Sequence, residues 1–234
     1  MHARPPAQIT DAPAPWRLRG RGYISLLRFP VNSTAQDAFL PASLAGRRSG
    51  SRTAWMMFVD YAHSDVGPYH ELLFIPGSFP FEDGRRHLSI SRIFVSSMDS
   101  VVNGQRNWGI PKDLARFDVR YGDDGIDEVT VRQDGELIAG LRYRSWPLPL
   151  PFSTALVPRA WRTLGQHRDG SSFIYTPSAN GWIRPARLLE ARSNPALFPD
   201  LAGVSSPLSV AVPRFAMTFP VSTVLPLSIE EPGR

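Results

Sequence analysis

Lys112 is the residue of this sequence with the most distinctive chemistry. The 234-residue chain has 26 Lys and Arg residues, and Lys112 is the single lysine, so the other 25 are arginines. A lysine amine can lose its proton and attack a carbonyl carbon, whereas an arginine guanidinium stays protonated in proteins. The composition therefore indicates that Lys112 occupies a position where a guanidinium cannot serve. A single lysine that remained by chance in an arginine-rich chain would give the same count.

The residues next to Lys112 restrict the backbone and are mostly apolar. In residues 108–112 (WGIPK), Pro111 fixes its own φ, and Gly109 permits an unusual φ or a close approach. A lysine held in an apolar pocket has its charged form disfavoured, and its pKa falls by up to about 3–5 units when it is fully buried. The neutral amine can then form a Schiff base with a ketone or aldehyde. The alternative is a lysine in a surface turn beside Asp113, and the residues alone leave both open.

Short strands are expected to position this segment, because alternating and apolar runs bounded by turn residues dominate the chain. The predicted strands lie at residues 22–29, 53–61, 70–75, 88–96, 117–121, 129–131, 136–144, 172–175, 208–212 and 214–219. The pair Asp134-Gly135 predicts a tight hairpin turn. Short helices are predicted at residues 34–40, 154–164 and 185–192, since the 23 prolines interrupt longer ones.

These elements predict a mostly β fold (α+β by strict count), with an antiparallel sheet curled or closed into a barrel-like core and a few short helices. Residues 1–15 are rich in proline and alanine and are expected to form an irregular N-terminal tail. No internal repeat or low-complexity linker marks a further boundary, so residues 16–234 are expected to form a single domain.

The composition also excludes several classes of site. The chain has no cysteine, which excludes disulfides, thiolate catalysis and Cys-ligated metals. Its five histidines show no metal-ligand spacing, and no Walker loop, Gly-x-Gly-x-x-Gly fingerprint or Gly-x-Ser-x-Gly elbow is present. We therefore expect neither a metal nor a cofactor.

Charge and hydropathy patterns narrow the expected partners and location. The net charge is +5, but the arginines are scattered instead of forming a basic stripe, so no nucleic-acid partner is expected. The N-terminal residues lack the apolar stretch of a secretory signal, and no run approaches the roughly 20 apolar residues of a membrane-spanning helix. These features predict a cytoplasmic protein without a membrane partner.

Three segments together resemble the acetoacetate decarboxylase superfamily. They are residues 67–71 (GPYHE), residues 90–97 (ISRIFVSS) leading into 103–106 (NGQR), and residues 108–115 (WGIPKDLA). Residues 21–23 (RGY) also resemble an Arg-x-Tyr of the family before its first strand. The recognisable part covers residues 20–145. The resemblance implies a cone-like or barrel-like antiparallel fold, acetoacetate decarboxylase-like, in a homo-oligomer.

Carried over by position, the resemblance implies roles for individual residues. Lys112 is similar to the Schiff-base nucleophile, Glu71 to a pocket carboxylate, and Arg21 to an arginine near that carboxylate. Arg28 could fill the role of Arg21 instead. The residues expected to bind substrate are Arg28, Met56, Phe58, Phe74 and Trp108.

The sequence departs from the pattern of the family at two positions. The decarboxylase proper has a second lysine directly after the nucleophile, where this chain has Asp113, and a nearby carboxylate would raise the pKa of the amine. Adjacent residues of an extended segment point to opposite sides, so Asp113 is expected to point away from Lys112. A second pocket glutamate of the family falls near Met56, which cannot transfer a proton. The resemblance therefore implies lysine chemistry without fixing acetoacetate as the substrate.

These observations predict a carbon–carbon lyase that decarboxylates a small β-keto acid through an iminium on Lys112. In this hypothesis Glu71 moves protons and Arg21 orients Glu71. Two alternatives stay open. One is an aldolase or dehydratase that uses the same lysine, and the other is a non-catalytic protein that binds a small acidic molecule with Lys112 as an ordinary cation.

Overall fold

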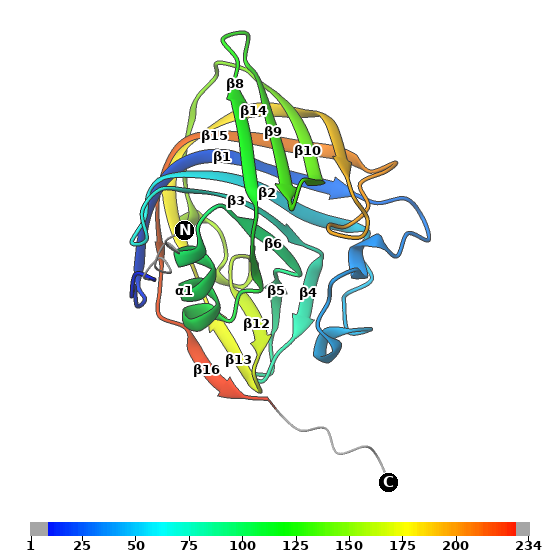
Figure 1. Cartoon of the computed structure of the whole chain (residues 1–234). Coiled ribbons are helices and arrows are strands. Elements are labelled where there is room, and N and C mark those ends of the chain that lie inside the picture. The colour runs from blue at the N-terminus through cyan, green and yellow to red at the C-terminus, as the bar shows by residue number, and fades with distance from the viewer. Residues whose placement is uncertain (1–8, 228–234) are drawn as a thin grey trace, which may run out of the picture.

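A computed structural model of the chain describes residues 9–227, and most of this part is strand (Figure 1). Its strands are β1 (Trp16–Arg28), β2 (Thr53–His63), β3 (Tyr69–Ile75), β4 (Gly77–Pro80), β5 (Arg86–Ser89), β6 (Arg92–Val95), β7 (Lys112–Leu114), β8 (Arg116–Tyr121), β9 (Ile126–Gln133), β10 (Glu136–Ser145), β11 (Leu150–Ser153), β12 (Leu164–Arg168), β13 (Ser171–Tyr175), β14 (Ser178–Ser193), β15 (Ser205–Phe219) and β16 (Thr223–Pro226). The single α-helix of the described part is α1 (Met98–Trp108). Short 3₁₀ turns lie at Ala35–Asp37, Ala42–Leu44, Thr154–Leu156 and Arg159–Trp161.

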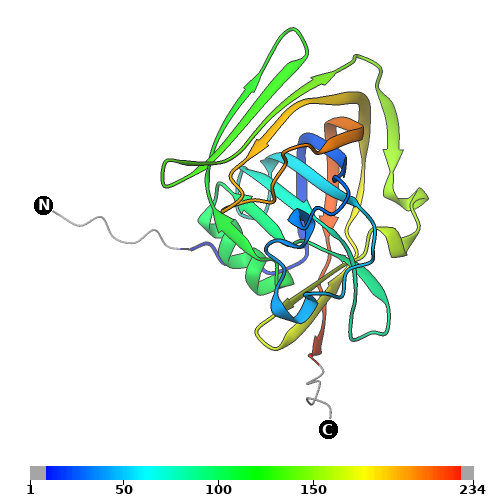
Figure 2. The same cartoon turned by 90° about the vertical axis from the view of Figure 1, so that its right-hand side faces the viewer.

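The larger sheet curls into a nearly closed, barrel-like layer (Figure 1, Figure 2). Its strands follow the order β7-β6-β3-β2-β1-β15-β14-β10-β9-β8, and β11 pairs with β14 beside this path. The pairs are antiparallel except for β6 with β7. The two edge strands, β7 and β8, are separated in the chain by Ala115 alone, so the two edges of the sheet meet at this residue.

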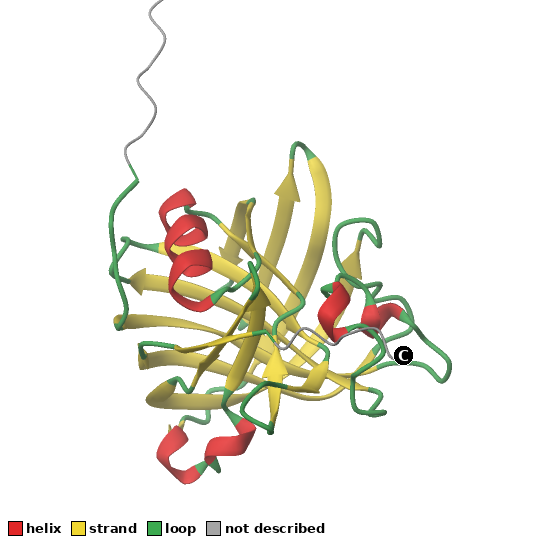
Figure 3. Cartoon of the chain, turned by 90° about the horizontal axis from the view of Figure 1, so that it is seen from below, coloured by secondary structure: helices red, strands yellow, loops and turns green. Residues whose placement is uncertain are grey.

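A smaller sheet and the helix complete the part of the fold that surrounds Lys112. The smaller sheet has the order β16-β13-β12-β5-β4. The helix α1 lies beside β6, β7 and β13, on the outside of the strands (Figure 3). It begins after Ser97, whose hydroxyl accepts a hydrogen bond from the backbone N–H of Ser100, and ends at Gly109, which has a left-handed φ of 64°.

The central strands of the larger sheet are buried on both faces, and successive side chains enter two different apolar cores. The first core includes Met56, Phe58, Leu72, Phe74 and Phe94. The second core includes Tyr61, Tyr69, Leu73, Ile75 and Ile93, with Met57 and Val59 packed against it. This alternation decides which of the candidate residues can share a cavity.

Most predicted strands are confirmed, and the predicted helices are wrong. Residues 34–40 and 154–164 form only 3₁₀ turns, and residues 185–192 lie within β14. The predicted strand at 88–96 is divided between β5 and β6. Sequence patterns missed α1 because MDSVVNGQRNW contains several weak helix formers, and its stability comes from its caps and from packing.

Residues 9–15 of the predicted tail form no helix or strand, and they are bound to α1. The backbone N–H of Ala12 donates to Oδ1 of Asn103 at 3.0 Å, and the Asn103 amide donates to the carbonyl of Thr10 at 2.7 Å. The rest of the predicted tail, residues 1–8, and the last residues of the predicted domain, 228–234, lie outside the described residues. Within residues 9–227, none of the helices has the length and apolar character needed to cross a membrane.

Candidate active site

A tight connection from α1 into β7 places Lys112 at the first position of β7. The helix ends at Gly109 in a conformation that favours glycine, and Pro111 cannot continue a helix. A β-carbon at Gly109 would also lie 2.7 Å from Cδ2 of Phe173, so the close packing of this turn requires glycine. The turn directs the Lys112 side chain back against α1.

The Lys112 side chain is buried along α1, where Gly104 makes room for it. A β-carbon at Gly104 would lie 2.7 Å from Cδ and 2.8 Å from Cε of Lys112, closer than packed carbon atoms approach each other. Lys112 is only 3% exposed. The structure therefore favours the buried lysine over the surface turn that the sequence left open.

Two acceptors hold the Lys112 amine. Nζ donates to Oε2 of Glu71 at 2.9 Å and to Oγ of Ser100 at 3.0 Å. It also lies 5.2 Å from the centre of the Tyr69 ring, within the range of a cation–π contact. The Glu71 carboxylate is as deeply buried as the amine, and their separation is short enough for direct proton transfer.

Two tyrosines surround the Glu71 carboxylate. The hydroxyl of Tyr61 donates to Oε1 of Glu71 at 3.1 Å. Tyr61 pairs with Tyr69, which lies two residues before Glu71, so all three side chains point to the same face of the sheet. Burial raises the pKa of Tyr61 and of Tyr69 well above the usual value, and the charge of Glu71 raises both pKa values further. Nearby hydroxyls offset part of the increase at Tyr69. Both hydroxyls therefore stay protonated at neutral pH.

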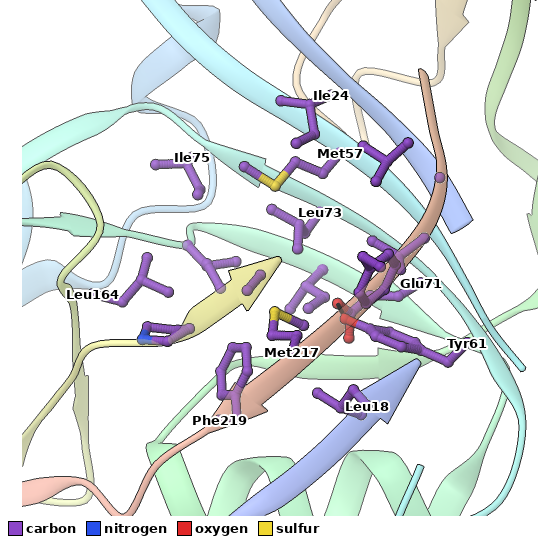
Figure 4. Close-up of a pocket in the computed structure, with 18 of the residues that line it drawn as sticks. Leu18, Ile24, Met57, Tyr61, Glu71, Leu73, Ile75, Leu164, Met217 and Phe219 are labelled. Carbon is purple, nitrogen blue, oxygen red and sulfur yellow. Dashed lines mark hydrogen bonds between the residues drawn. The ribbon is translucent and has the colours of Figure 1, made fainter. Parts of the chain in front are cut away.

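These groups border a cavity of about 290 Å³. Its charged lining residues are Glu71, Lys112 and Arg162, and most of the others are aliphatic or aromatic. In Figure 4, Glu71 lies beside Tyr61 at one side of the cavity, and the aliphatic wall extends from there toward Leu164. The volume suits a small organic molecule whose polar end meets the lysine and whose body contacts the apolar wall.

The predicted substrate-binding residues divide between the two faces of the sheet. Trp108 lines the cavity, whereas Met56 and Phe74 are buried in the first core and do not. Phe58 borders the cavity, but its ring lies in the first core and stacks on Phe117 at 6.4 Å. The β2 and β3 residues that face the cavity include their neighbours in sequence, Met57, Val59 and Leu73.

The structure does not bring Arg21 or Arg28 to Glu71. Arg21 pairs in register with Asp60, and its Nε donates to that carboxylate at 3.2 Å. Its guanidinium lies over the Tyr121 ring, 3.2 Å from the ring centre, on the opposite face of the sheet from Glu71. Arg28 is exposed at the end of β1 and does not line the cavity. In the structure, Tyr61 and not an arginine is therefore positioned to orient Glu71.

The expectation for Asp113 agrees with the structure. Its carboxylate forms an ion pair with Arg92, and the side chain is 46% exposed. The carboxylate thus lies on the opposite side of β7 from the Lys112 amine, as alternation in an extended segment requires.

Sequence reasoning missed three residues that contact the lysine or the carboxylate: Tyr61, Tyr69 and Ser100. The two tyrosines could have been found from the strand pattern. Tyr69 lies two residues before Glu71, and Tyr61 pairs with Tyr69 from the neighbouring strand, so both point to the same face as Glu71. Ser100 could not have been found in this way, because its place depends on the helix that the sequence patterns did not show. Among residues 9–227, no group of three His, Asp or Glu side chains could hold a metal ion.

The buried amine, its carboxylate partner and the apolar cavity form an arrangement suited to carbonyl chemistry. An amine beside a proton acceptor can attack a carbonyl carbon once its proton has moved to that acceptor. The apolar wall excludes water from the reacting groups, which strengthens the electrostatic interactions among them.

Comparison with solved structures finds similar folds among acetoacetate decarboxylases and related enzymes. Acetoacetate decarboxylase from Legionella pneumophila subsp. pneumophila str. Philadelphia 1 is similar with a TM-score of 0.67 and 16% identity, over 95% of this chain and 92% of that chain. An acetoacetate decarboxylase-like enzyme from Sphingomonas wittichii RW1 is similar with a TM-score of 0.65 and 13% identity, over 97% and 98%. The enduracididine biosynthesis enzyme MppR, complexed with the condensation product of pyruvate and imidazole 4-carboxaldehyde, is similar with a TM-score of 0.61 and 15% identity, over 94% and 92%.

The structural comparisons show the shared fold, and a sequence comparison identifies the family. The comparison with curated proteins found no match. The family described as acetoacetate decarboxylase (ADC) matches residues 3–183, which is more than half of the chain. The chain therefore belongs to the acetoacetate decarboxylase family.

Proposed function

We propose that this protein is a carbon–carbon lyase that decarboxylates a β-keto acid through a Schiff base on Lys112. The observation that carries the proposal is the burial of the single lysine of the chain in a cavity, with its amine 2.9 Å from the Glu71 carboxylate. A buried ion pair is weak evidence for a purely stabilising role, because the loss of hydration offsets much of the attraction.

The reaction begins with transfer of a proton from the Lys112 amine to Glu71. The neutral nitrogen then attacks the ketone carbon, a carbon–nitrogen bond forms, and loss of water gives the iminium. The bond between the α-carbon and the β-carboxylate breaks next. Its electron pair moves toward the iminium, which gives an enamine, and carbon dioxide leaves. Glu71 gives its first proton to the departing water, so it relays a second proton from solvent to the enamine carbon. Hydrolysis of the resulting iminium by water releases the ketone and the free amine.

The apolar cavity supports the bond-breaking step. The departing carboxylate is charged and becomes neutral carbon dioxide, so the poorly hydrated cavity of this site disfavours the charged reactant more than the product. A cation that gripped this carboxylate would stabilise the reactant and slow the step. The absence of Arg21 from the cavity lining is consistent with this requirement.

An aldolase or dehydratase activity is the second candidate. The same iminium and enamine allow carbon–carbon bond formation, and MppR, which shares the fold, has been crystallised with a condensation product of pyruvate and an aldehyde. Glu71 would serve in either reaction, since both need a group that moves a proton near the iminium.

Trapping with borohydride tests the shared step. The protein is incubated with a panel of β-keto acids and pyruvate, reduced with borohydride, and mapped by peptide mass spectrometry. We expect an adduct on Lys112 in the wild type and none in Lys112→Arg, whose guanidinium cannot form the iminium. Carbon dioxide release from the β-keto acid identifies the decarboxylase, and a condensed product with an added aldehyde identifies the aldolase. The absence of an adduct with every compound would refute the proposal and leave a binding protein.

A further inference from the structure

Arg162 is partly buried, and one buried nitrogen of its guanidinium has no hydrogen-bond partner within residues 9–227. It follows the 3₁₀ turn Arg159–Trp161 and precedes β12. One terminal nitrogen donates to the carbonyl of Pro177 at 2.8 Å, but its buried Nε has no hydrogen-bond partner within residues 9–227. No described carboxylate forms an ion pair with it. A buried charged donor without an acceptor is costly, so the position indicates a site that a ligand completes.

Arg162 also lines the cavity that contains the Lys112 amine. Glu71 forms its ion pair with Lys112, and no ion pair joins it to Arg162 within residues 9–227. The remaining wall of the cavity includes Ile24, Met57, Leu73 and Ile75. The cavity therefore holds a reacting group, a cation that is not paired with it, and an apolar surface.

A basic groove adjoins the cavity at Arg162. This second hollow, of about 300 Å³, shares Leu18, Thr154, Arg162, Ala179 and Met217 with the cavity. Its lining includes Arg17 and Arg19, which alternate along β1 with the cavity residue Leu18, and none of its lining residues is acidic. With three arginines and no acidic residue in its lining, this groove creates a positive potential that attracts anions toward Arg162.

We propose that Arg162 is a specificity-determining residue that binds a second anionic group of the substrate. The substrate class is then an oxo acid with an apolar chain between the reacting carbonyl and a distal carboxylate. The assignment of the reacting end rests on the proposed function, and the assignment of the distal end rests on Arg162 alone. The distal carboxylate differs from the one that leaves, because a guanidinium bound to the departing group would slow its loss.

Binding of unreactive probes tests the distal end without any turnover. The probes are straight-chain carboxylic acids from butanoic to decanoic acid and the primary alcohols of the same lengths, measured by calorimetry. We expect the wild type to bind the best acid about ten- to a hundredfold more tightly than its alcohol, because a charge-assisted hydrogen bond is lost in the alcohol. Arg162→Gln is expected to bind acid and alcohol equally, with alcohol affinity unchanged as evidence of an intact cavity.

Two further variants locate the anion. Arg159→Gln removes an exposed arginine three residues away that does not line either hollow, and it should keep the wild-type preference. The double variant Glu71→Gln/Lys112→Met should also keep it, since the anion is held away from the lysine. Should Arg162→Gln misfold, Arg162→Lys is expected to keep a reduced preference, as it retains the charge without the fork of donors.

The two proposals fail in distinguishable ways. A preference for acids that survives in Arg162→Gln, or that disappears in the double variant, would overturn the role of Arg162. Equal binding of acids and alcohols by the wild type would also overturn it. Neither result affects the borohydride adduct on Lys112, and a missing adduct would leave the binding preference of Arg162 in place.

Discussion

Replacing Gly104 with alanine would press a methyl group against the stem of Lys112 without changing any reacting atom. The added carbon would lie 2.7 Å from Cδ and 2.8 Å from Cε of the lysine. Carbon atoms in contact are normally about 3.5–4.0 Å apart, so the stem has to move by roughly 1 Å. The Nζ contacts with Glu71 and Ser100, at 2.9 and 3.0 Å, would then be lost or lengthened.

We expect this substitution to lower activity and to leave stability nearly unchanged. A misplacement of about 1 Å at a reacting group lowers the rate by about 10²-fold. Alanine is favoured over glycine inside a helix by roughly 0.5–1 kcal/mol, which offsets strain from the displaced stem. We therefore expect the Gly104→Ala variant to keep a thermal unfolding midpoint near that of the wild type while its rate of adduct formation on Lys112 falls about a hundredfold.

The assay is the initial rate of borohydride-trapped adduct with the β-keto acid that gives the highest yield in the wild type. Gly50→Ala is the matched control, because a β-carbon at Gly50 meets no atom within 4 Å. An adduct rate in Gly104→Ala equal to that of the wild type would refute the reasoning that packing against α1 sets the position of the amine.

Three further substitutions have defined outcomes. Glu71→Gln leaves the buried Lys112 amine without a counter-charge, so kcat should fall by about 10²–10⁴ and the free energy of unfolding in urea by about 3–5 kcal/mol; an unchanged kcat would exclude Glu71 as the proton carrier. Tyr61→Phe removes the donor to Glu71 and should lower the free energy of unfolding by about 1.5–3 kcal/mol, an effect that must shrink in the Glu71→Gln background if the hydrogen bond causes it. Burial lowers the pKa of His167, and Glu82 only partly opposes this, so the unfolded chain binds a proton that the folded chain does not. Stability in denaturant should therefore fall as the pH drops below about 6.5, and His167→Gln should flatten that dependence; an identical pH profile in the variant would contradict the assignment.

The strands were predictable where one face is buried and the other is exposed. β8, β9 and β10 show alternation between apolar and polar residues, and the Asp134-Gly135 turn fixes the connection of β9 to β10. β14 was mistaken for a helix over residues 185–192. Its pattern of exposed arginines and apolar residues fits both the period of about 3.6 residues of a helix and the period of about 2 residues of a strand. The local pattern cannot show the neighbouring strands that hold this long segment extended.

The buried pair of Lys112 and Glu71 that we propose reacts was predictable from the sequence, and most of its surroundings were not. Lys112 and Glu71 stood out through composition and resemblance. The residues of TAWMMFVDY that face the cavity could not be identified in this way. β2 is buried on both faces, and a continuous apolar run does not show which of its residues point to which face. Met56 was chosen where Met57 lines the cavity for this reason. Arg162 was also missed, since its unpaired state is a property of the folded chain.

The enclosure of the only lysine side chain gives this protein a built-in reporter. An acylating reagent that modifies amines has one side chain to attack, and that amine is only 4% accessible in the folded chain. Labelling of Lys112 should therefore wait for openings that admit the reagent, and its rate should rise with denaturant as those openings become more frequent. Occupancy of the cavity by a ligand should slow the same labelling. The modification rate of one residue therefore measures both how often the cavity opens and how far a ligand occupies it.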